Sequence, residues 1–392
     1  MPLNEFSAAL STEPDWRDAT SQLCDEIGTS PKTSYDMAVV FISTHHQENV
    51  AAIADQIRTD LGCSCLIGCT GESIIGGDRE VEDGPAIAVW VASLPGITLT
   101  QMHLTYDRTP DGGSILGWPD ATLDDWPTGS ALLLLGDPFS FPTDALLAQL
   151  NTKQPGIPVI GGNASGAQTP GHIRLVVGEQ IVDEGAVGIL MQGDTGIRTL
   201  VSQGCRPIGD HFVITKAEQN VIHELGGKPA LIQLKHVFDT LSEPEQALVQ
   251  TGLHLGRVVS EYQDHFDQGD FLIRNVLGID PENGTIAVAD YMRPGQTVQF
   301  QIRDEESADA ELQFLLQELT QREGFTPGGG ILFNCNGRGT RLFSQPNHDA
   351  SAIAQSLGNI PLAGFFAAGE IGPVGNENFV HGFTASLIVF PK

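Results

Sequence analysis

The sequence predicts an α/β protein with two domains of stacked sheets and outer helices, built from repeated β-α-β-β units. Short apolar runs are bounded by Gly or Pro, which is typical of buried strands. Helices with one apolar stripe fall between some of these runs. The same order of elements occurs three times, and 392 residues exceed one ordinary hydrophobic core.

The first copy of the unit is expected after a leading helix in residues 1–34, which Pro14 can open and Gly28 can close. The elements expected in this copy are, in order, a buried strand at Met37–Ser43, an amphipathic helix at Glu48–Leu61, a strand at Cys63–Gly68 that ends in the loop GCTGES (68–73), an acidic Gly-rich loop (76–84), and strands at Ala86–Ser93 and Ile97–Leu104. The last two strands are expected to pair with each other through the turn at Pro95-Gly96.

The second and third copies repeat this order. The second consists of a strand at Ala131–Leu135, a helix at Thr143–Leu150, a strand at Pro158–Ile160 that leads into GGNASG (161–166), and strands at Ala186–Gln192 and Ile197–Ser202. The third consists of a strand at Ile331–Phe333, a helix at His348–Leu357, a strand at Leu362–Phe366 followed by a loop that reaches Glu370, and a strand at Phe383–Phe390. Each copy has a small-residue loop after its second strand, so the three loops are expected at equivalent sheet edges.

Residues 204–327 separate the second copy from the third. The elements expected there are helices at Pro229–Leu241 and Ser307–Arg322 and strands at Leu253–Ser260, Phe271–Leu277, Ile286–Asp290 and Thr297–Ile302. The composition changes near residues 204–209. We therefore expect one domain in residues 1–205 and a second in residues 206–392.

The charge of the chain excludes two classes of partner. Acidic residues outnumber basic ones 49 to 20, and the formal net charge is −29, which repels nucleic acid and anionic membrane surfaces. The sequence does not begin with a basic segment and an apolar segment of the kind found in signal peptides, and no apolar run approaches the ~20 residues that span a bilayer. We expect a cytoplasmic protein.

The six cysteines are expected to be reduced in that compartment. Cys63, Cys65 and Cys69 have a spacing that could bind zinc, but a fourth ligand would have to come from afar. Cys63 and Cys65 are instead expected to share one face of a strand as small core residues. The sequence therefore predicts no metal site.

Several motifs occur in order along nearly the whole chain. They are GCTGES (68–73), GGNASG (161–166), CRPIGDHFVIT (205–215), FLIRNVLGID (271–280), GQTVQFQIRD (295–304), FNCNGRG (333–339), GFFAAGEIGP (364–373) and HGFT (381–384). Together they resemble the FIST family, which has an N-terminal and a C-terminal FIST domain. The resemblance implies a sensory protein that binds a small cytosolic ligand, with amino acids as the suggested class, and signals through a partner or a fused output domain. No length is left for a fused output domain, so the signalling partner is expected in trans.

Polar residues at strand ends of the third copy form the candidate ligand site. Glu370 follows Gly369 in a turn, where a carboxylate can accept hydrogen bonds from a ligand amine. Arg338 suits recognition of a ligand carboxylate, or it forms a salt bridge to Glu370, and both roles place it beside Glu370. The residues expected to line the site are Asn334, Cys335, Asn336, Arg338, Gly369, Glu370 and His381, together with Glu72 and Asn163 from the loops of the other two copies.

Three alternatives are compatible with the sequence. Some members of the family carry haem, and His381 could ligate its iron in a gas sensor. Cys335 and His381 could instead form the nucleophile and base of an enzyme, although the sequence offers no third orienting residue and no oxyanion motif. The protein could also be a scaffold whose clefts bind nothing. The sequence favours a small-ligand sensor that is not an enzyme.

Overall fold

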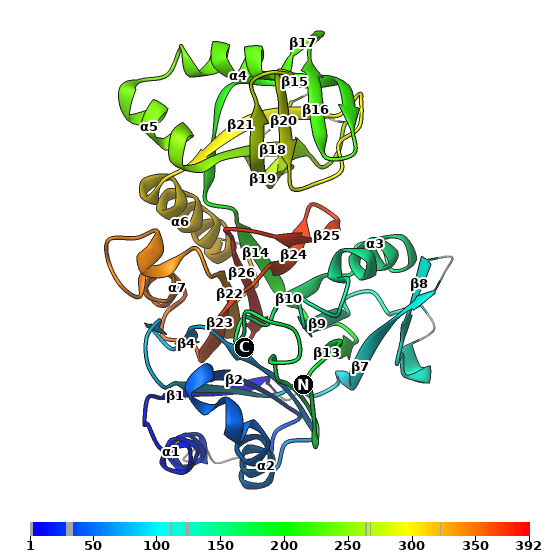
Figure 1. Cartoon of the computed structure of the whole chain (residues 1–392). Helices are drawn as coiled ribbons and strands as arrows, with labels where there is room; N and C mark the ends of the chain where they lie inside the picture. Colours follow the sequence, from blue (N-terminus) through cyan, green and yellow to red (C-terminus); the bar gives the residue numbers. More distant parts are fainter. Residues whose placement is uncertain are drawn as a thin grey trace. The chain divides into compact units, whose positions relative to one another are not determined.

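The computed structural model describes residues 3–28, 34–109, 112–122, 125–262, 265–266, 268–321 and 323–392 (Figure 1). The chain divides into two compact units, one made of Met1–Ser202 with Leu312–Lys392 and the other of Gln203–Glu311. The chain leaves the first unit close to the expected boundary at residue 205, but it returns at Leu312. The third copy therefore folds with the first two.

The described residues of the first unit form three sheets. The first has the strand order β1 (Glu5–Ser11), β6 (Ile87–Ser93), β2 (Met37–Ser43), β3 (Cys65–Gly71), β11 (Leu175–Val177), β12 (Gln180–Val182). The second has the order β8 (Gly112–Leu116), β7 (Thr98–Thr109), β13 (Ala186–Gln192), β9 (Ala131–Gly136), β10 (Val159–Asn163), β24 (Glu370–Val374), β25 (Glu377–His381). The third has the order β14 (Arg198–Ser202), β26 (Ala385–Pro391), β22 (Pro327–Cys335), β23 (Leu362–Ala367), β4 (Ile74–Gly76), β5 (Arg79–Val81).

Each of these three sheets contains four strands in the same arrangement. Two of them are parallel: β2 with β3, β9 with β10, and β22 with β23. The last strand of the copy runs antiparallel to the first of them, as β6, β13 and β26. A fourth strand borders that one in the antiparallel sense, as β1, β7 and β14. The predicted α/β class and the repeated unit are confirmed.

Each copy gives a hairpin to the sheet of another copy. The hairpin β4–β5 of the first copy pairs with β23 of the third. The hairpin β11–β12 of the second pairs with β3 of the first, and β24–β25 of the third pairs with β10 of the second. Figure 1 shows β4 beside β23. The exchange is cyclic, so each of the three sheets ends in two strands from another copy.

One glycine recurs at the same register position in the three parallel pairs. Gly68 pairs with Val40, Gly161 with Leu134, and Gly364 with Leu332. A Cβ added to these glycines would lie 2.3, 1.8 and 1.9 Å from the carbonyl oxygen of the paired residue. A side chain cannot occupy that space, so the close approach of the two strands requires glycine in every copy.

Helices cover the outer faces of the sheets. α1 (Trp16–Gly28) and α2 (Val50–Asp60) cover the first sheet, and α3 (Thr143–Lys153) covers the second. α6 (Glu305–Gln321) and α7 (His348–Leu357) bury apolar side chains against the third, including the predicted leucines 312, 316 and 319. The predicted last residue of α6, residue 322, lies outside the described residues. None of the helices in the described part of the chain is both long and apolar enough to cross a lipid bilayer.

The inner faces of the sheets share one core. The ring of Phe41 on β2 stacks on Phe365 of β23 at 5.1 Å and meets Phe333 of β22 edge-on at 6.2 Å. Leucines of β9 and isoleucines of β10 and β13 belong to the same apolar cluster. Because the cluster draws on all three copies, burial of apolar surface links them to one another.

The second unit is a closed ring of strands. The order is β15 (Cys205–Glu218), β21 (Thr297–Arg303), β18 (Leu253–Val258), β19 (Phe271–Asp280), β20 (Thr285–Val288), β16 (Val221–Leu225), β17 (Lys228–Pro229), and β15 also pairs with β16. α4 (Ala230–Phe238) packs Leu234 and Val237 into its apolar cluster, and α5 (Glu243–Gly252) precedes β18.

Several local predictions are wrong. Residues 5–11, expected to belong to the leading helical segment, form a strand that pairs with β6, whereas α1 has the expected start and end. The loop expected at 76–84 contains β5, and β7 pairs with β13 rather than with β6. Cys63 and Cys65 do not share a face, because Cys63 packs beneath the helices and Cys65 packs against the inner core.

The Phe365→Ala substitution is expected to destabilise the first unit by about 3–5 kcal/mol, because it leaves a cavity where rings from two copies meet. Urea unfolding followed by circular dichroism measures the loss. Phe314→Ala is the matched control, since Phe314 is 60% exposed, and it is expected to change stability by less than about 0.5 kcal/mol. Equal losses in both variants would contradict a core shared between copies.

Candidate functional site

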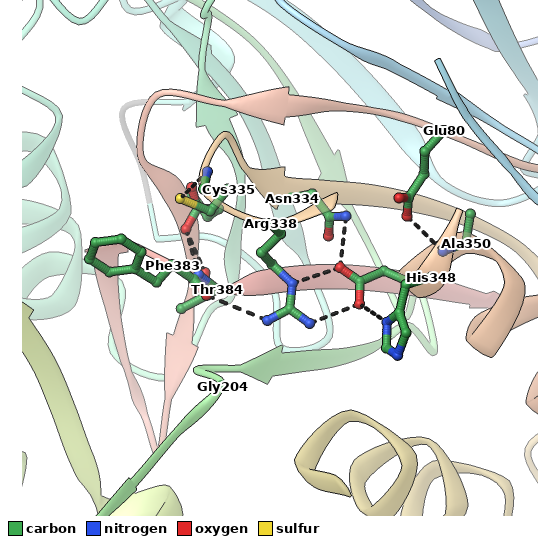
Figure 2. A network of polar contacts seen from close by, with 12 residues as sticks. Glu80, Gly204, Asn334, Cys335, Arg338, His348, Ala350, Phe383 and Thr384 are labelled. Carbon is green, nitrogen blue, oxygen red and sulfur yellow. Dashed lines mark hydrogen bonds and ion pairs between the residues drawn. The ribbon is translucent and has the colours of Figure 1, made fainter. Parts of the chain in front are cut away.

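Three segments of the third copy meet at one edge of the third sheet. The backbone N–H of Cys335, at the end of β22, donates to the carbonyl of Thr384 at 2.9 Å. The N–H of Asn336 donates to the carbonyl of Ala367, at the end of β23, at 3.2 Å. Figure 2 shows Asn334, Cys335, Arg338 and Thr384 grouped at this edge. The predicted convergence of these strand ends is therefore present.

A buried ion pair between Arg338 and Asp349 lies beneath the edge. Nε and Nη2 of Arg338 donate to the two carboxylate oxygens of Asp349 at 2.6 and 2.8 Å, and both side chains are fully buried. Asn334 Nδ2 donates to the same carboxylate at 2.9 Å, and His348 Nδ1 lies 3.0 Å from it. Burial opposes ionisation of Asp349, but the guanidinium and these hydrogen bonds hold its pKa well below the usual range.

The predicted salt bridge between Arg338 and Glu370 is wrong. The first turn of α7 places the Asp349 carboxylate against the guanidinium, in the two-bond geometry that arginine favours. Other contacts of Arg338 include the start of β26, where Nη1 lies 3.5 Å from the Phe383 carbonyl, and the ring of Phe343, over which the guanidinium lies. Figure 2 shows Arg338 between Phe383 and His348. The arginine therefore supports the edge from below and is not exposed to a ligand.

The exchanged hairpin of the first copy brings a carboxyl group to this network. Glu80 of β5 is buried, and its Oε1 accepts the N–H of Ala350 on α7 at 3.0 Å. Its own N–H donates to Asn347 Oδ1 at 2.7 Å. Burial and the nearby charge of Asp349 raise the pKa of Glu80 to about 8. Sequence reasoning missed both Glu80 and Asp349, because one lay in an apparent surface loop and the other in an ordinary helix start.

Glu370 is fully buried at the start of β24. Its Oε2 accepts the N–H of Thr384 at 3.0 Å and the hydroxyl of Thr384 at 2.8 Å. Among the described residues no N–H or O–H donates to Oε1, and the thiol of Cys335 is the remaining donor near the carboxyl group. Burial raises the pKa of Glu370 to about 7, although these hydrogen bonds and the charge of Arg338 act against the rise.

The backbone at Phe383 has an unusual conformation. Its φ is +70°, a region that bulky side chains rarely adopt. The next residue, Thr384, gives both of its donors to Glu370, and the preceding contacts hold the Phe383 carbonyl near Arg338. Strain of this kind persists where neighbouring contacts compensate for it, and it occurs often at functional sites.

His381 does not fit the role of a haem ligand. It is the register partner of Glu370 in the hairpin β24–β25, and it is 3% exposed. Its Nε2 hydrogen-bonds the Gly372 carbonyl at 2.9 Å, so this nitrogen carries the proton. Coordination of iron through Nε2 would break that bond inside a buried hairpin. The residues present give haem no support at this position.

The loops of the other two copies reach the same edge. The Asn163 N–H donates to the Gly369 carbonyl at 2.8 Å, and the Ala368 N–H donates to the Asn163 carbonyl at 2.9 Å. Glu72 forms an ion pair with Arg341, whose Nη1 donates to the Asn336 carbonyl at 2.8 Å. All the predicted residues thus belong to one group with two layers. The buried layer is Asn163, Asn334, Arg338, Glu370 and His381, and the half-buried layer is Glu72, Cys335, Asn336 and Gly369.

Two family models match the chain, the FIST N domain over residues 36–228 and the FIST C domain over residues 230–373. The chain belongs to the FIST family. An uncharacterized protein of Mycobacterium tuberculosis strain H37Rv is 42% identical to this FIST protein over 391 residues, which cover 98% of this chain and 99% of the relative. An uncharacterized protein of Mycobacterium bovis is 41% identical over 391 residues, 98% of each chain. FIST domains are in general associated with the sensory binding of small ligands in signalling.

Removing one partner of the buried ion pair is expected to cost about 3–5 kcal/mol, because it leaves the other charge uncompensated. Arg338→Met and Asp349→Leu test this singly, and the double variant is expected to be more stable than either one. The control Arg17→Gln removes a pair that is exposed on both sides and lies at 3.9 Å, and it is expected to change little. Chemical unfolding measures the free energy of unfolding of these four variants. Single variants of Arg338 and Asp349 that are as stable as the native protein would contradict the burial of this pair.

Glu80 makes stability depend on pH in a defined direction. Its pKa in the folded protein, about 8, lies above that of an unfolded glutamate, so its contribution is complete below pH 4.5 and is lost as the pH rises through 8. Glu80→Gln is expected to reduce the fall in Tm between pH 5 and 8 by about 2–4 °C. The exposed Glu377→Gln is the control in differential scanning calorimetry. A pH slope that Glu80→Gln leaves unchanged would contradict the assignment.

Proposed function

We propose that this FIST protein is a sensor that reversibly binds a small metabolite carrying an ammonium group, such as an amino acid, at the edge formed by β22, β23 and β26. The observation that carries the proposal is the Oε1 atom of Glu370, a buried carboxylate oxygen that accepts no N–H or O–H from the described residues. A buried acceptor without a donor costs about 1–3 kcal/mol, and a ligand donor recovers that energy.

Oxygen atoms that could accept a further hydrogen bond gather at this edge. Within the described residues, Asn334 Oδ1 and Asn336 Oδ1 also have no hydrogen-bond partner, and these residues flank Cys335 in the sequence. An ammonium group offers three donors and a positive charge, which suits carboxylate and amide oxygens. A ligand of this class therefore complements the site better than an anion or an apolar molecule does.

The half-buried layer supports access to Glu370. Gly369, next to Glu370, and Gly382, two residues before Thr384, present no side chain, and Cys335 is only partly covered. Arg341 lies at the same edge with a side chain that is 58% exposed, and its guanidinium can hold the carboxylate end of an amino acid. An amino acid would thus bind between a buried carboxyl group and an exposed arginine.

Binding at this edge would act on segments from all three copies. The contacts of Gly369 with Asn163 and of Arg341 with Glu72 tie the third copy to the second and the first. A ligand that moves either contact changes how the loops of the three copies are held. We propose that a signalling protein in trans recognises this change.

A calorimetric screen of amino acids and small amines, with their deaminated analogues as controls, tests the proposal. Glu370→Gln keeps the volume and the hydrogen bonds from Thr384 but removes the charge, and it is expected to weaken binding at least tenfold. Glu377→Gln, on the hairpin strand that pairs with β24, is expected to bind normally. Binding should also be about tenfold weaker at pH 6 than at pH 8, because the ligand needs an ionised Glu370 whose pKa is about 7.

Two results would contradict this function. The first is the absence of any binding by amines across the screen. The second is a bound amine whose affinity is the same in Glu370→Gln and at both pH values, which would place the ligand elsewhere.

A further inference from the structure

Cys335 differs from the other cysteines in its surroundings. Burial raises the pKa of four thiols, those of Cys24, Cys63, Cys65 and Cys69, and Cys205 is 1% exposed. Thiols of that kind react slowly with oxidants, because the thiolate is the reactive form. Cys335 is half-buried at the end of β22, and its Sγ accepts the N–H of Gly337 at 3.3 Å. A backbone N–H directed at sulfur stabilises negative charge there.

A base lies beside this thiol. The carboxyl group of Glu370 is fully buried, and the Cys335 thiol is hydrogen-bonded to it. Thr384 holds Oε2 of this carboxyl group through two hydrogen bonds, from its N–H and its hydroxyl, which restrict the rotation of the carboxyl group. The carboxyl group of Glu370 therefore adjoins the partly exposed thiol, in position to receive its proton.

We propose that hydrogen peroxide oxidises Cys335 reversibly to a sulfenic acid, with Glu370 as the base. The thiol proton passes to Glu370 as sulfur attacks one peroxide oxygen. An S–O bond forms and the O–O bond breaks, and the leaving hydroxide takes the proton from Glu370 and departs as water. Sulfur loses two electrons and the peroxide gains them. Two molecules of a small thiol restore the cysteine: the first forms a mixed disulfide with Cys335 and releases water, and the second releases the Cys335 thiol and leaves as the small disulfide.

The product fits the site better than the thiol does. A sulfenic O–H is a stronger hydrogen-bond donor than S–H, and Oε1 of Glu370 has no N–H or O–H donor among the described residues. The oxidised cysteine supplies that donor from within the chain. If the proposed ammonium ligand binds at the same oxygen, oxidation and ligand binding compete. That competition rests on the proposed function, whereas the oxidation itself does not.

Treatment of the full chain with hydrogen peroxide and dimedone, followed by peptide mass spectrometry, tests the proposal. Dimedone marks sulfenic acids, and the other cysteines serve as internal controls in the same sample. Cys335 is expected to be labelled at least tenfold faster than Cys65, the other half-buried cysteine. Glu370→Gln is expected to slow the labelling at least tenfold, and dithiothreitol added before dimedone is expected to abolish it.

The ratio of the labelling rates of Cys335 and Cys65 in the native protein tests the proposal even if Glu370→Gln folds poorly. Labelling of Cys335 at the rate of Cys65 would overturn the proposal. So would an unchanged rate in a folded Glu370→Gln protein, since the carboxylate would then not act as base. Amine binding by the native protein in dithiothreitol without peroxide, and dimedone labelling without amine, keep the two proposals apart, because each measurement can succeed while the other fails.

Discussion

The cyclic exchange of hairpins is the constraint on which the first unit depends. Each sheet needs a hairpin from another copy, and the inner faces of all three bury one apolar cluster. The exchange also builds the site, because β5 carries Glu80 to the helix that holds Asp349, and β24 carries Glu370 to the edge of β10. A copy that folded by itself would contain neither the complete sheet nor the complete polar network.

Electrostatics at this edge follow from burial. The chain has a net charge of −29, and at this edge the buried Arg338 neutralises Asp349. Within the described residues no ion pair joins Glu80 or Glu370 to a cation of its own. Desolvation therefore raises the pKa of Glu80 and Glu370 to values at which both can gain or lose a proton near neutral pH. The network therefore has two parts. Arg338 and Asp349 keep their charges over the neutral pH range, whereas Glu370, beside Cys335, can change its protonation state there.

Local patterns in the sequence predicted the strand at Met37–Ser43 and the helix at His348–Leu357 with their observed bounds. They also predicted the three copies, and they grouped Asn334, Cys335, Glu370 and His381, which lie at one edge in the structure. The hairpin exchange was not predictable, because a short strand such as β5 has the same pattern whichever sheet accepts it. The partner of Arg338 was not predictable either. The distance along the sequence does not distinguish Glu370 from Asp349, and only the position of α7 brings Asp349 to the guanidinium.

The pairing of β4 with β23 has a consequence for synthesis of the chain. Gly76 leaves the ribosome long before its register partner Ala363. At about 5–20 residues per second, the first hairpin waits roughly a quarter of a minute to a full minute for its acceptor strand. During translation its apolar edge is open to other chains. The acidic residues that surround this hairpin in the sequence would then repel neighbouring nascent chains and preserve the edge for its own acceptor.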